Sequence, residues 1–154
     1  MEVFRSLPGG MAELILVTHS AIESSEGVTV YNDMKANTAE LVALCQTCDV
    51  FVLPSKAEAF GIAAVEASAL GLPVIGAKVG GLEDIVSNEE NGYLVPPGDM
   101  AALAQRLLML AENPSIRQAY GRASRKRAIM SFDARKNSSR LIDILHEVKR
   151  ESIL

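Results

Sequence analysis

Two glutamates, one in a turn that leads from a strand into a helix and one in that helix, are the residues best placed for chemistry. Glu58 lies in the turn and Glu66 follows eight residues later in the helix. Between them, the helix opens at Phe60 and Gly61, where free backbone N–H groups and the helix dipole favour an anion. Gly61 carries no side chain that would hold a phosphate away. The turn can therefore hold a diphosphate without a lysine.

Glu66 is the one carboxylate in an apolar helical segment, residues 62–70, that we expect to be buried on nearly every side. Burying a charge without a partner costs several kcal/mol, so Glu66 needs an internal bond or a ligand. One turn beyond a bound phosphate, its carboxylate can accept both hydroxyls of a ribose. Glu58 lies at the mouth, where a sugar attached to that phosphate would be. The alternatives are a salt bridge or cap for Glu66 and an exposed, inactive carboxylate for Glu58.

Two further loops follow predicted strands. Residues 78–82 contain Gly80 and Gly81, a stretch of backbone that allows a ligand to approach closely, although a lone Gly-Gly pair is usually only a turn. Residues 93–99 form the other loop. In a doubly wound sheet, ligands bind outside the carboxyl ends of the strands, so both loops and the turn at residues 55–61 belong to the candidate site.

Short apolar strands alternate with helices through most of the chain. This pattern predicts right-handed crossovers and a parallel sheet covered on both faces. The expected fold is α/β, a Rossmann-like doubly wound parallel sheet of about five strands with C-terminal helices. The predicted strands are Glu13–Thr18, Val28–Tyr31, Asp49–Pro54, Pro73–Ala77 and Gly92–Val95.

Helices are predicted at both ends of the chain. Residues 1–7 resemble the end of a helix that begins further upstream, which indicates a domain cut at its N-terminus. Toward the other end, Asp99 and Asp133 each precede a helical pattern that they can cap, and Asn113-Pro114-Ser115 ends one helix and starts the next; Thr38 can cap a further helix in the middle of the chain. The last helix carries an apolar stripe that we expect to pack on this domain's own sheet rather than on a missing domain: Leu141, Ile142, Leu145 and Val148.

Composition excludes several classes of protein. The chain has 154 residues, 49% of them hydrophobic and 22% charged, with a net charge of -4, which fits one soluble domain over residues 1–154. Nothing indicates a nucleic-acid partner, because the basic run Arg122–Arg127 is typical of a solvated helix face. No apolar segment reaches the ~20 residues of a membrane span, and no signal peptide is evident, so we expect a cytoplasmic location with no sign of membrane association.

Cys45 and Cys48 have the spacing of a zinc or redox pair. A zinc site needs further ligands, but His19 and His146 are far apart in sequence. A redox pair needs a helix N-terminus, whereas these cysteines end an apolar helical run. We interpret them as small buried residues. The sequence also lacks a paired aspartate motif, so no metal or other cofactor is expected.

From about Asp49 to Asp133, the chain resembles the C-terminal domain of the retaining glycosyltransferases of group 1 (family four), which have two Rossmann-like domains in the GT-B arrangement. The matching elements stand in the family's order. They are residues 49–55, the E-x7-E element from Glu58 to Glu66, Gly71–Val74, Gly80-Gly81, Asn91–Asp99 and Ser131-Phe132. Upstream, residues 13–43 fit more loosely, with a polar loop where many relatives carry a helix.

The resemblance implies roles for single residues. It implies that Glu66 binds the ribose of a nucleoside diphosphate sugar and that Glu58 acts as the catalytic-site carboxylate, in contact with hydroxyls of the transferred sugar. Backbone amides from Phe60 through Ile62 to Ala63 would meet the diphosphate. Ser55, Gly80 and Gly81 would complete the donor site. After the double glycine the family usually has a glutamate, but this chain has Glu83 followed by Asp84, so that acid stays unassigned.

The resemblance implies transfer of a sugar from a nucleoside diphosphate sugar to an acceptor hydroxyl, with retention of configuration. The family's basic phosphate contacts and its N-terminal acceptor domain come from segments upstream of this chain. The isolated chain is therefore expected to bind a donor weakly and to transfer nothing. Two rivals remain: a non-catalytic nucleotide-binding module, and a nucleotide-sugar epimerase of the same architecture, which would need acid and base residues that we do not find.

Overall fold

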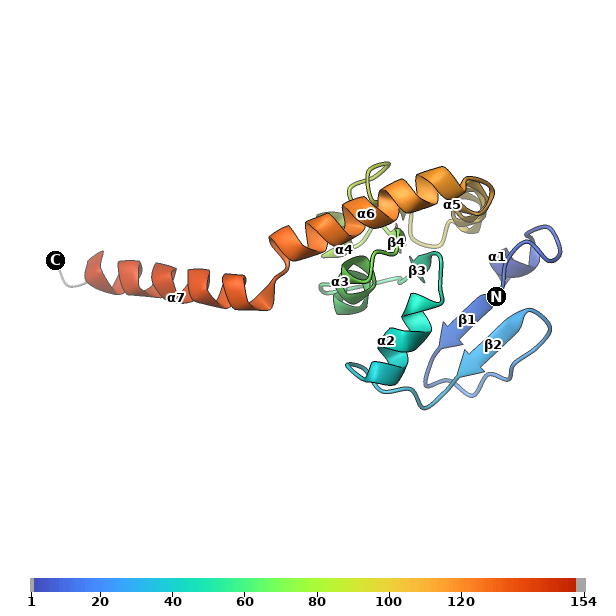
Figure 1. The fold of residues 1–154 in the computed structure, drawn as a ribbon, viewed down its shortest axis with the longest axis horizontal. Coiled ribbons are helices and arrows are strands. Elements are labelled where there is room, and N and C mark those ends of the chain that lie inside the picture. The colour runs from blue at the N-terminus through green and yellow to red at the C-terminus, as the bar shows by residue number, and fades with distance from the viewer. Residues whose placement is uncertain (1, 152–154) are drawn as a thin grey trace.

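The computed structural model describes residues 2–151, so Met1 of the predicted first helix lies outside the described residues (Figure 1). Seven helices and five strands are assigned within this range. In chain order they are α1 (Glu2–Arg5), β1 (Leu14–Val17), β2 (Val28–Tyr31), α2 (Ala39–Gln46), β3 (Phe51–Leu53), α3 (Ile62–Ala69), β4 (Val74–Ala77), α4 (Leu82–Ile85), β5 (Gly92–Val95), α5 (Met100–Glu112), α6 (Pro114–Ser131) and α7 (Ala134–Glu151).

The five strands confirm the predicted α/β class and its parallel pairing, but they form two sheets instead of one. β1 pairs with β2, from Leu14 opposite Val28 to Val17 opposite Tyr31. β4 is the centre of the other sheet, in which β3 and β5 pair with it on either side. All of these pairs are parallel. The expectation of a single five-stranded sheet is therefore wrong for the described residues, because β1 does not pair with β3.

The core surrounds β4, whose four residues are all buried. Val74 belongs to a cluster that contains residues of α3 and α4, including Ala64 and Leu82. Ile75, the next residue along the strand, belongs to a second cluster formed with α1, β5 and α5. Successive side chains of a strand point to opposite faces, so the three-stranded sheet is covered on both sides. Coverage of both faces is typical of a doubly wound sheet.

The β1–β2 sheet is much less buried than the sequence predicts. The apolar run of β1 is typical of a strand covered on both faces, yet three of its residues are only half-buried and Val17 is 42% exposed. Among the described elements, only β2 packs broadly against β1. The prediction of a buried strand fails here because burial depends on the neighbours of a strand as well as on its own residues.

Polar residues cap the helices where the sequence places them. The side chain of Thr38 accepts a hydrogen bond from the backbone N–H three residues further on, as does that of Asp99. Asn113 stands at the start of α6, with Pro114 as its first residue, but its side chain does not cap that helix and donates instead to the Met109 carbonyl of α5 at 2.8 Å. The Asp133 carboxylate accepts from two backbone N–H groups at the start of α7. These caps separate the three C-terminal helices.

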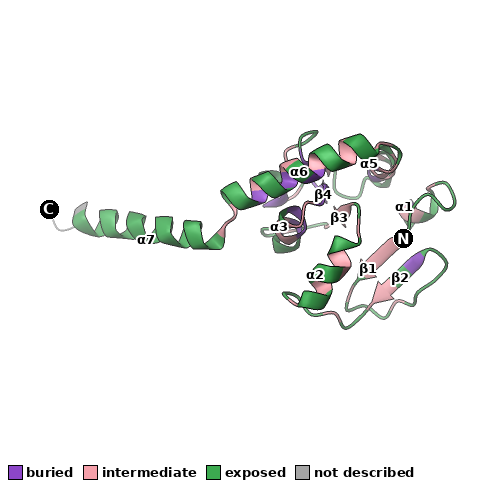
Figure 2. Ribbon diagram, in the orientation of Figure 1, coloured by how far each residue is buried: buried purple, intermediate pink, exposed green. Residues whose placement is uncertain are grey.

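Helix α7 extends away from the rest of the molecule, and Figure 2 colours it as exposed along its length. In its apolar stripe, Leu141 and Leu145 are each 57% exposed and Ile142 is 52% exposed. The prediction that this stripe packs on the domain's own sheet is therefore wrong. No helix within residues 2–151 combines the length and apolar character needed to cross a bilayer.

Candidate functional site

The predicted site loops meet at the carboxyl ends of β3, β4 and β5. These ends surround a shallow hollow of about 20 Å³. Because parallel strands end at the same edge of a sheet, residues that are distant in sequence come together here. The hollow is lined by Pro54, Ala77, Val95, Pro96, Gly98, Asp99, Met100 and Leu103. The loop at residues 55–61 continues from this edge into α3.

The N-terminus of α3 carries no capping side chain. Gly61 is its N-cap, with a left-handed backbone (φ 95°), and the Gly61 carbonyl accepts hydrogen bonds from the N–H groups of Ala64 and Val65. The N–H groups of Ile62 and Ala63 precede these first intrahelical bonds, and both residues are exposed. Uncapped N–H groups at the positive end of a helix are suited to an oxyanion.

Gly61 also fixes where α3 begins. A β-carbon at this position would lie 2.8 Å from Cδ2 of Leu82 and 3.2 Å from Cδ1 of Ile85. Leu82 and Ile85 are fully buried in α4, so they have little room to move. A glycine is required both by the left-handed conformation and by this packing. The start of α3 is therefore held against α4.

Gly80 and Gly81 lie directly against the backbone of the first site loop. A β-carbon on Gly80 would overlap the carbonyl oxygen of Glu58, and one on Gly81 would lie 2.6 Å from Cα of Phe60. The Gly81 N–H also donates to the carbonyl of Ala59, at 3.3 Å. The close approach that these glycines permit is therefore between two loops of the protein. The sequence could not distinguish this contact from an approach to a ligand.

Glu66 lies one helical turn beyond Ile62 on the same face of α3. This face is not covered: Ile62 is 66% exposed, and Glu66 is half-buried. The expectation that the helix is buried on nearly every side is wrong, because only its opposite face, with Ala64, Ala67 and Ser68, is buried. Within the described residues, no hydrogen bond or ion pair engages the Glu66 carboxylate. The salt bridge considered as an alternative is not formed here.

Glu58 and Ser55 both lie in the loop between β3 and α3, and both side chains are half-buried. In the described part of the chain, neither side chain has a hydrogen-bond partner. The structure thus places Glu58 on the same edge as the α3 N-terminus. It does not by itself assign a role to either residue.

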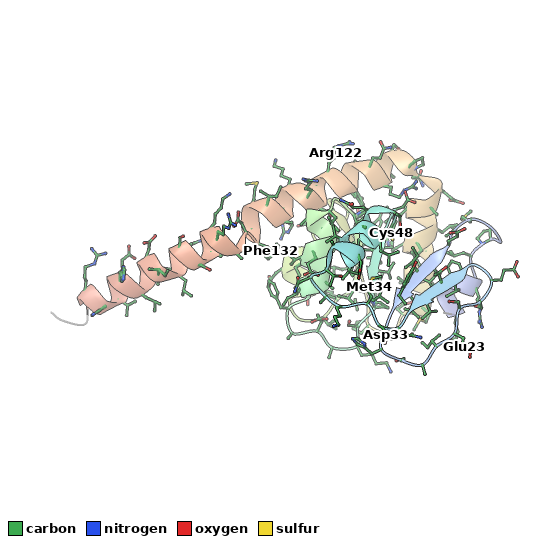
Figure 3. All side chains as sticks on the ribbon, turned by 60° about the horizontal axis from the view of Figure 1, so that its bottom comes forward. Glu23, Asp33, Met34, Cys48, Arg122 and Phe132 are labelled. Atoms are coloured by element: carbon green, nitrogen blue, oxygen red, sulfur yellow. The ribbon has the colours of Figure 1, made fainter. Side chains whose placement is uncertain are left out.

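Phe60 connects the site to the end of α6. Phe60 is 44% exposed, and its ring meets that of Phe132 edge-on, with 5.8 Å between the centroids. Arg127, also from α6, donates from Nη2 to the Asp84 carbonyl at 2.7 Å. Arg127 is thus a structural residue and not part of a purely solvated basic face. Figure 3 shows Phe132 at the junction of α6 with α7.

The two cysteines are half-buried free thiols, so their predicted burial is only partly realised. Burial raises the pKa of Cys45, and the nearby Cys48 and Glu66 add to the effect. Burial also raises the pKa of Cys48. A raised pKa disfavours the thiolate that redox or metal chemistry requires. Residues 2–150 hold no cluster of three or more His, Cys, Asp or Glu side chains arranged to bind a metal.

Sequence comparison places this chain in a known family. The model described as "Glycosyl transferases group 1" matches residues 20–127. The D-inositol 3-phosphate glycosyltransferase of Saccharomonospora viridis is 39% identical over 108 residues, which is 70% of this chain and 25% of that enzyme. The matched part of the chain thus covers about a quarter of the length of these curated relatives.

Solved structures agree with this assignment. Anabaena Alr3699/HepE in complex with UDP is similar with a TM-score of 0.69 and 26% identity, covering 78% of this chain and 32% of that one. The C-terminal domain of LpcC, a glycosyl transferase group 1 family protein from Francisella tularensis, is similar with a TM-score of 0.64 and 27% identity. That match covers 70% of this chain and 55% of the solved domain. The chain therefore belongs to the group 1 glycosyltransferases and corresponds to part of their C-terminal domain.

Proposed function

We propose that this chain binds the nucleoside diphosphate portion of a sugar donor for a retaining glycosyltransferase. The observation that carries the proposal is the exposed, uncapped N-terminus of α3, with Glu66 one turn further along the same face. The relative solved with UDP supports this choice of ligand. The diphosphate would accept hydrogen bonds from backbone N–H groups between Phe60 and Ala63.

Glu66 would bind the ribose. The Cα–Cβ bonds of a helix tilt toward its N-terminus, so a side chain at position 66 leans back over the first turn, where the diphosphate would lie. A carboxylate with no hydrogen-bond or ion-pair partner among residues 2–151 is available to accept both vicinal hydroxyls of a ribose. Its charge then gains the hydrogen bonds that the described residues do not supply.

Glu58 would contact the transferred sugar. It precedes the α3 N-terminus in the same loop, so it would lie beyond the diphosphate, on the side away from the ribose. Ser55 would line this part of the donor site. The contact of Gly80 and Gly81 with this loop would hold it in place while the donor binds. Catalysis would then rest on positioning and on stabilisation of the leaving diphosphate.

A further domain would supply the acceptor and the remaining charges. The matched part of this chain covers only 25% of the Saccharomonospora viridis relative, and the family resemblance assigns two basic phosphate contacts to upstream segments. The exposed stripe of α7, which includes Leu141, Ile142 and Leu145, is the apolar surface that such a domain would cover. We therefore propose that the parent enzyme has an N-terminal acceptor-binding domain that docks on α7.

A nucleotide titration tests donor binding by this chain. We expect UDP, GDP or ADP, added to the ¹⁵N-labelled protein, to shift amide resonances of residues 55–66 and 78–82 in a saturable manner. Inorganic phosphate is the control for a bare anion effect, and it should shift fewer of these resonances with weaker affinity. Absence of any shift at millimolar nucleotide would contradict the proposed site.

Transfer is expected to be absent from the isolated 154 residues. Without the upstream cations and acceptor domain, the leaving diphosphate loses electrostatic stabilisation of several kcal/mol, which corresponds to a rate loss of about a thousandfold or more. The measurement is release of nucleoside diphosphate from radiolabelled donors, in the presence and absence of simple sugar acceptors. Turnover by the isolated chain would overturn the requirement for a second domain.

A further inference from the structure

Helix α6 is held against the elements that form the candidate site at three points along its length. A β-carbon on Gly121 would overlap a backbone carbonyl oxygen just beyond the end of α3. The Ser124 hydroxyl donates to the Asn91 carbonyl, directly before β5, at 2.8 Å. Arg127 donates to the Asp84 carbonyl of α4 from Nε at 3.2 Å and from Nη2 at 2.7 Å. In Figure 1, α6 leads from these contacts into α7, so the elements that carry the site loops set its position.

Phe132 ends α6 and contacts the loop at residues 55–61. Its backbone N–H donates to the Ala128 carbonyl at 2.9 Å, which makes it the C-cap of the helix. Its side chain is half-buried and packs on the cluster that contains Ala64 and Leu82. From there the ring meets that of Phe60 edge to face, with the two ring planes 75° apart. This is a favoured arrangement of two aromatic rings, so the contact stabilises one position of the Phe60 ring.

The position of the Phe60 ring affects the direction of the amides that follow it. Phe60 directly precedes Gly61, the N-cap of α3, and the N–H groups of residues 62–63 come next. A backbone rotation that carried the ring away from Phe132 would also turn these peptide groups. On its other side, the Phe60 backbone lies against Gly81. The end of the loop is thus held between Gly81 and Phe132.

The chain continues from Phe132 directly into α7. The Asp133 carboxylate accepts from two backbone N–H groups in the first turn of α7. Nδ2 of Asn137 donates back to the Ser131 carbonyl at 3.0 Å. Side-chain bonds on both sides of Phe132 therefore join the end of α6 to the start of α7. A displacement of Phe132 would be transmitted to this α6–α7 junction, residues 131–137.

We propose that Phe132 is a positioning residue for the anion site at the start of α3. Through its ring contact with Phe60, it holds the amides of residues 60–63 in the direction that a bound diphosphate requires. The inference rests on the proposed nucleotide site and extends it to the α6–α7 junction. A bound diphosphate and the contact between the two rings favour the same conformation of the loop, so each stabilises the other.

Loss of the ring contact therefore lowers the apparent affinity for nucleotide. A loop that Phe132 no longer holds samples further conformations, and binding weakens by the fraction of molecules that keep the competent one. By reciprocity, nucleotide binding strengthens the ring contact and changes the junction. A purely structural Phe132 would act through the stability of the cluster beneath it instead, and its effect would not depend on Phe60.

A double-substitution cycle separates these two roles. In the complete 154-residue chain, we expect Phe132→Leu to weaken UDP binding by about twofold to tenfold, the range of one aromatic contact. Phe60→Leu should have a similar effect, and the double variant should bind UDP as well as Phe60→Leu alone. Additive losses would overturn the proposal, because Phe132 would then act independently of Phe60.

Two further variants control for the ring and for the end of the helix. Phe132→Tyr keeps the ring and should bind UDP like the wild type. Met130→Ala removes a side chain that is 69% exposed, two residues earlier in α6, and it should also leave the affinity unchanged. Calorimetric titration with UDP gives the affinity of each variant. A loss in Met130→Ala equal to that in Phe132→Leu would contradict a specific role of the ring.

Amide resonances of the unsubstituted chain provide a test that does not depend on how any variant folds. Saturation with UDP should shift the resonances of residues 131–137 together with those of residues 55–66. In Phe60→Leu the shifts at the junction should disappear, while those at residues 55–66 persist. Shifts at residues 55–66 without any at the junction would overturn this inference alone. No shift in either segment would overturn the proposed nucleotide site as well.

Discussion

Replacing Glu66 by alanine is expected to weaken nucleoside diphosphate binding by about tenfold to a hundredfold. A hydrogen bond to a charged group contributes ~1.5–3 kcal/mol, and the ribose would lose both of its bonds to this carboxylate. The folded state should lose little, because no described residue pairs with Glu66 and its side chain is half-buried on an exposed helix face. We therefore expect this variant to lose nucleotide affinity while its free energy of unfolding stays close to that of the wild type.

Two substitutions make the Glu66 result specific. Glu66→Gln keeps the shape but removes the charge, so it should bind less tightly than the wild type and more tightly than the alanine variant. Glu83→Ala removes an exposed carboxylate that forms an ion pair with Lys78 at 3.9 Å, and it should leave nucleotide affinity within about twofold. Calorimetric titration with UDP, together with thermal unfolding of each variant, gives both quantities. Equal affinity of Glu66→Ala and Glu83→Ala would exclude a ribose contact.

The sequence predicts the elements of this fold well where the signal is local. Strand β5 was predicted at its observed bounds, and Thr38, Asp99 and Asp133 cap their helices as expected. Such signals depend on residues within one turn or one strand. The location of the candidate site at the strand ends also follows from a general rule of parallel sheets.

Features that depend on distant partners were missed. Asn91 is 2% exposed, and its backbone carbonyl accepts from Oγ of Ser124, 33 residues further along the chain, at 2.8 Å. Its side chain also accepts from the Ser87 N–H at 2.7 Å and donates to the Ile85 carbonyl at 3.1 Å. The family pattern contains this asparagine. Its neighbours in sequence do not show whether its side chain is buried and hydrogen-bonded or lies exposed in a turn. The contact between Phe60 and Phe132 is likewise made by residues far apart in sequence.

The errors share one cause. The stripe of α7 and the run of β1 were expected to be buried because their own residues are apolar. Burial also requires a covering element, and no described element covers either of them widely. A pattern of apolar residues thus indicates that a surface needs to be covered, but it does not say which element or domain covers it.

Replacing Gly81 by alanine is expected to lower the free energy of unfolding by about 3 kcal/mol and to weaken nucleotide binding as well. The backbone of Gly81 is ordinary right-handed helix, with φ -64°, so alanine meets no conformational strain there. The added β-carbon instead meets the Phe60 backbone, 2.6 Å from its Cα and against its carbonyl oxygen. Overpacking usually costs ~1–3 kcal/mol, and a backbone neighbour has fewer ways to move than a side chain.

Gly9→Ala is the matched control for this substitution. Gly9 also has no left-handed conformation, and a β-carbon on it meets nothing within 4 Å. Both variants reduce unfolded-state entropy equally, so that contribution cancels when their urea midpoints are compared. A lower midpoint for Gly81→Ala alone would measure the contact between the two loops. A simultaneous loss of UDP affinity would show that this contact positions the N-terminus of α3, since Phe60 directly precedes the Gly61 cap. Equal midpoints would mean that the two loops separate without cost.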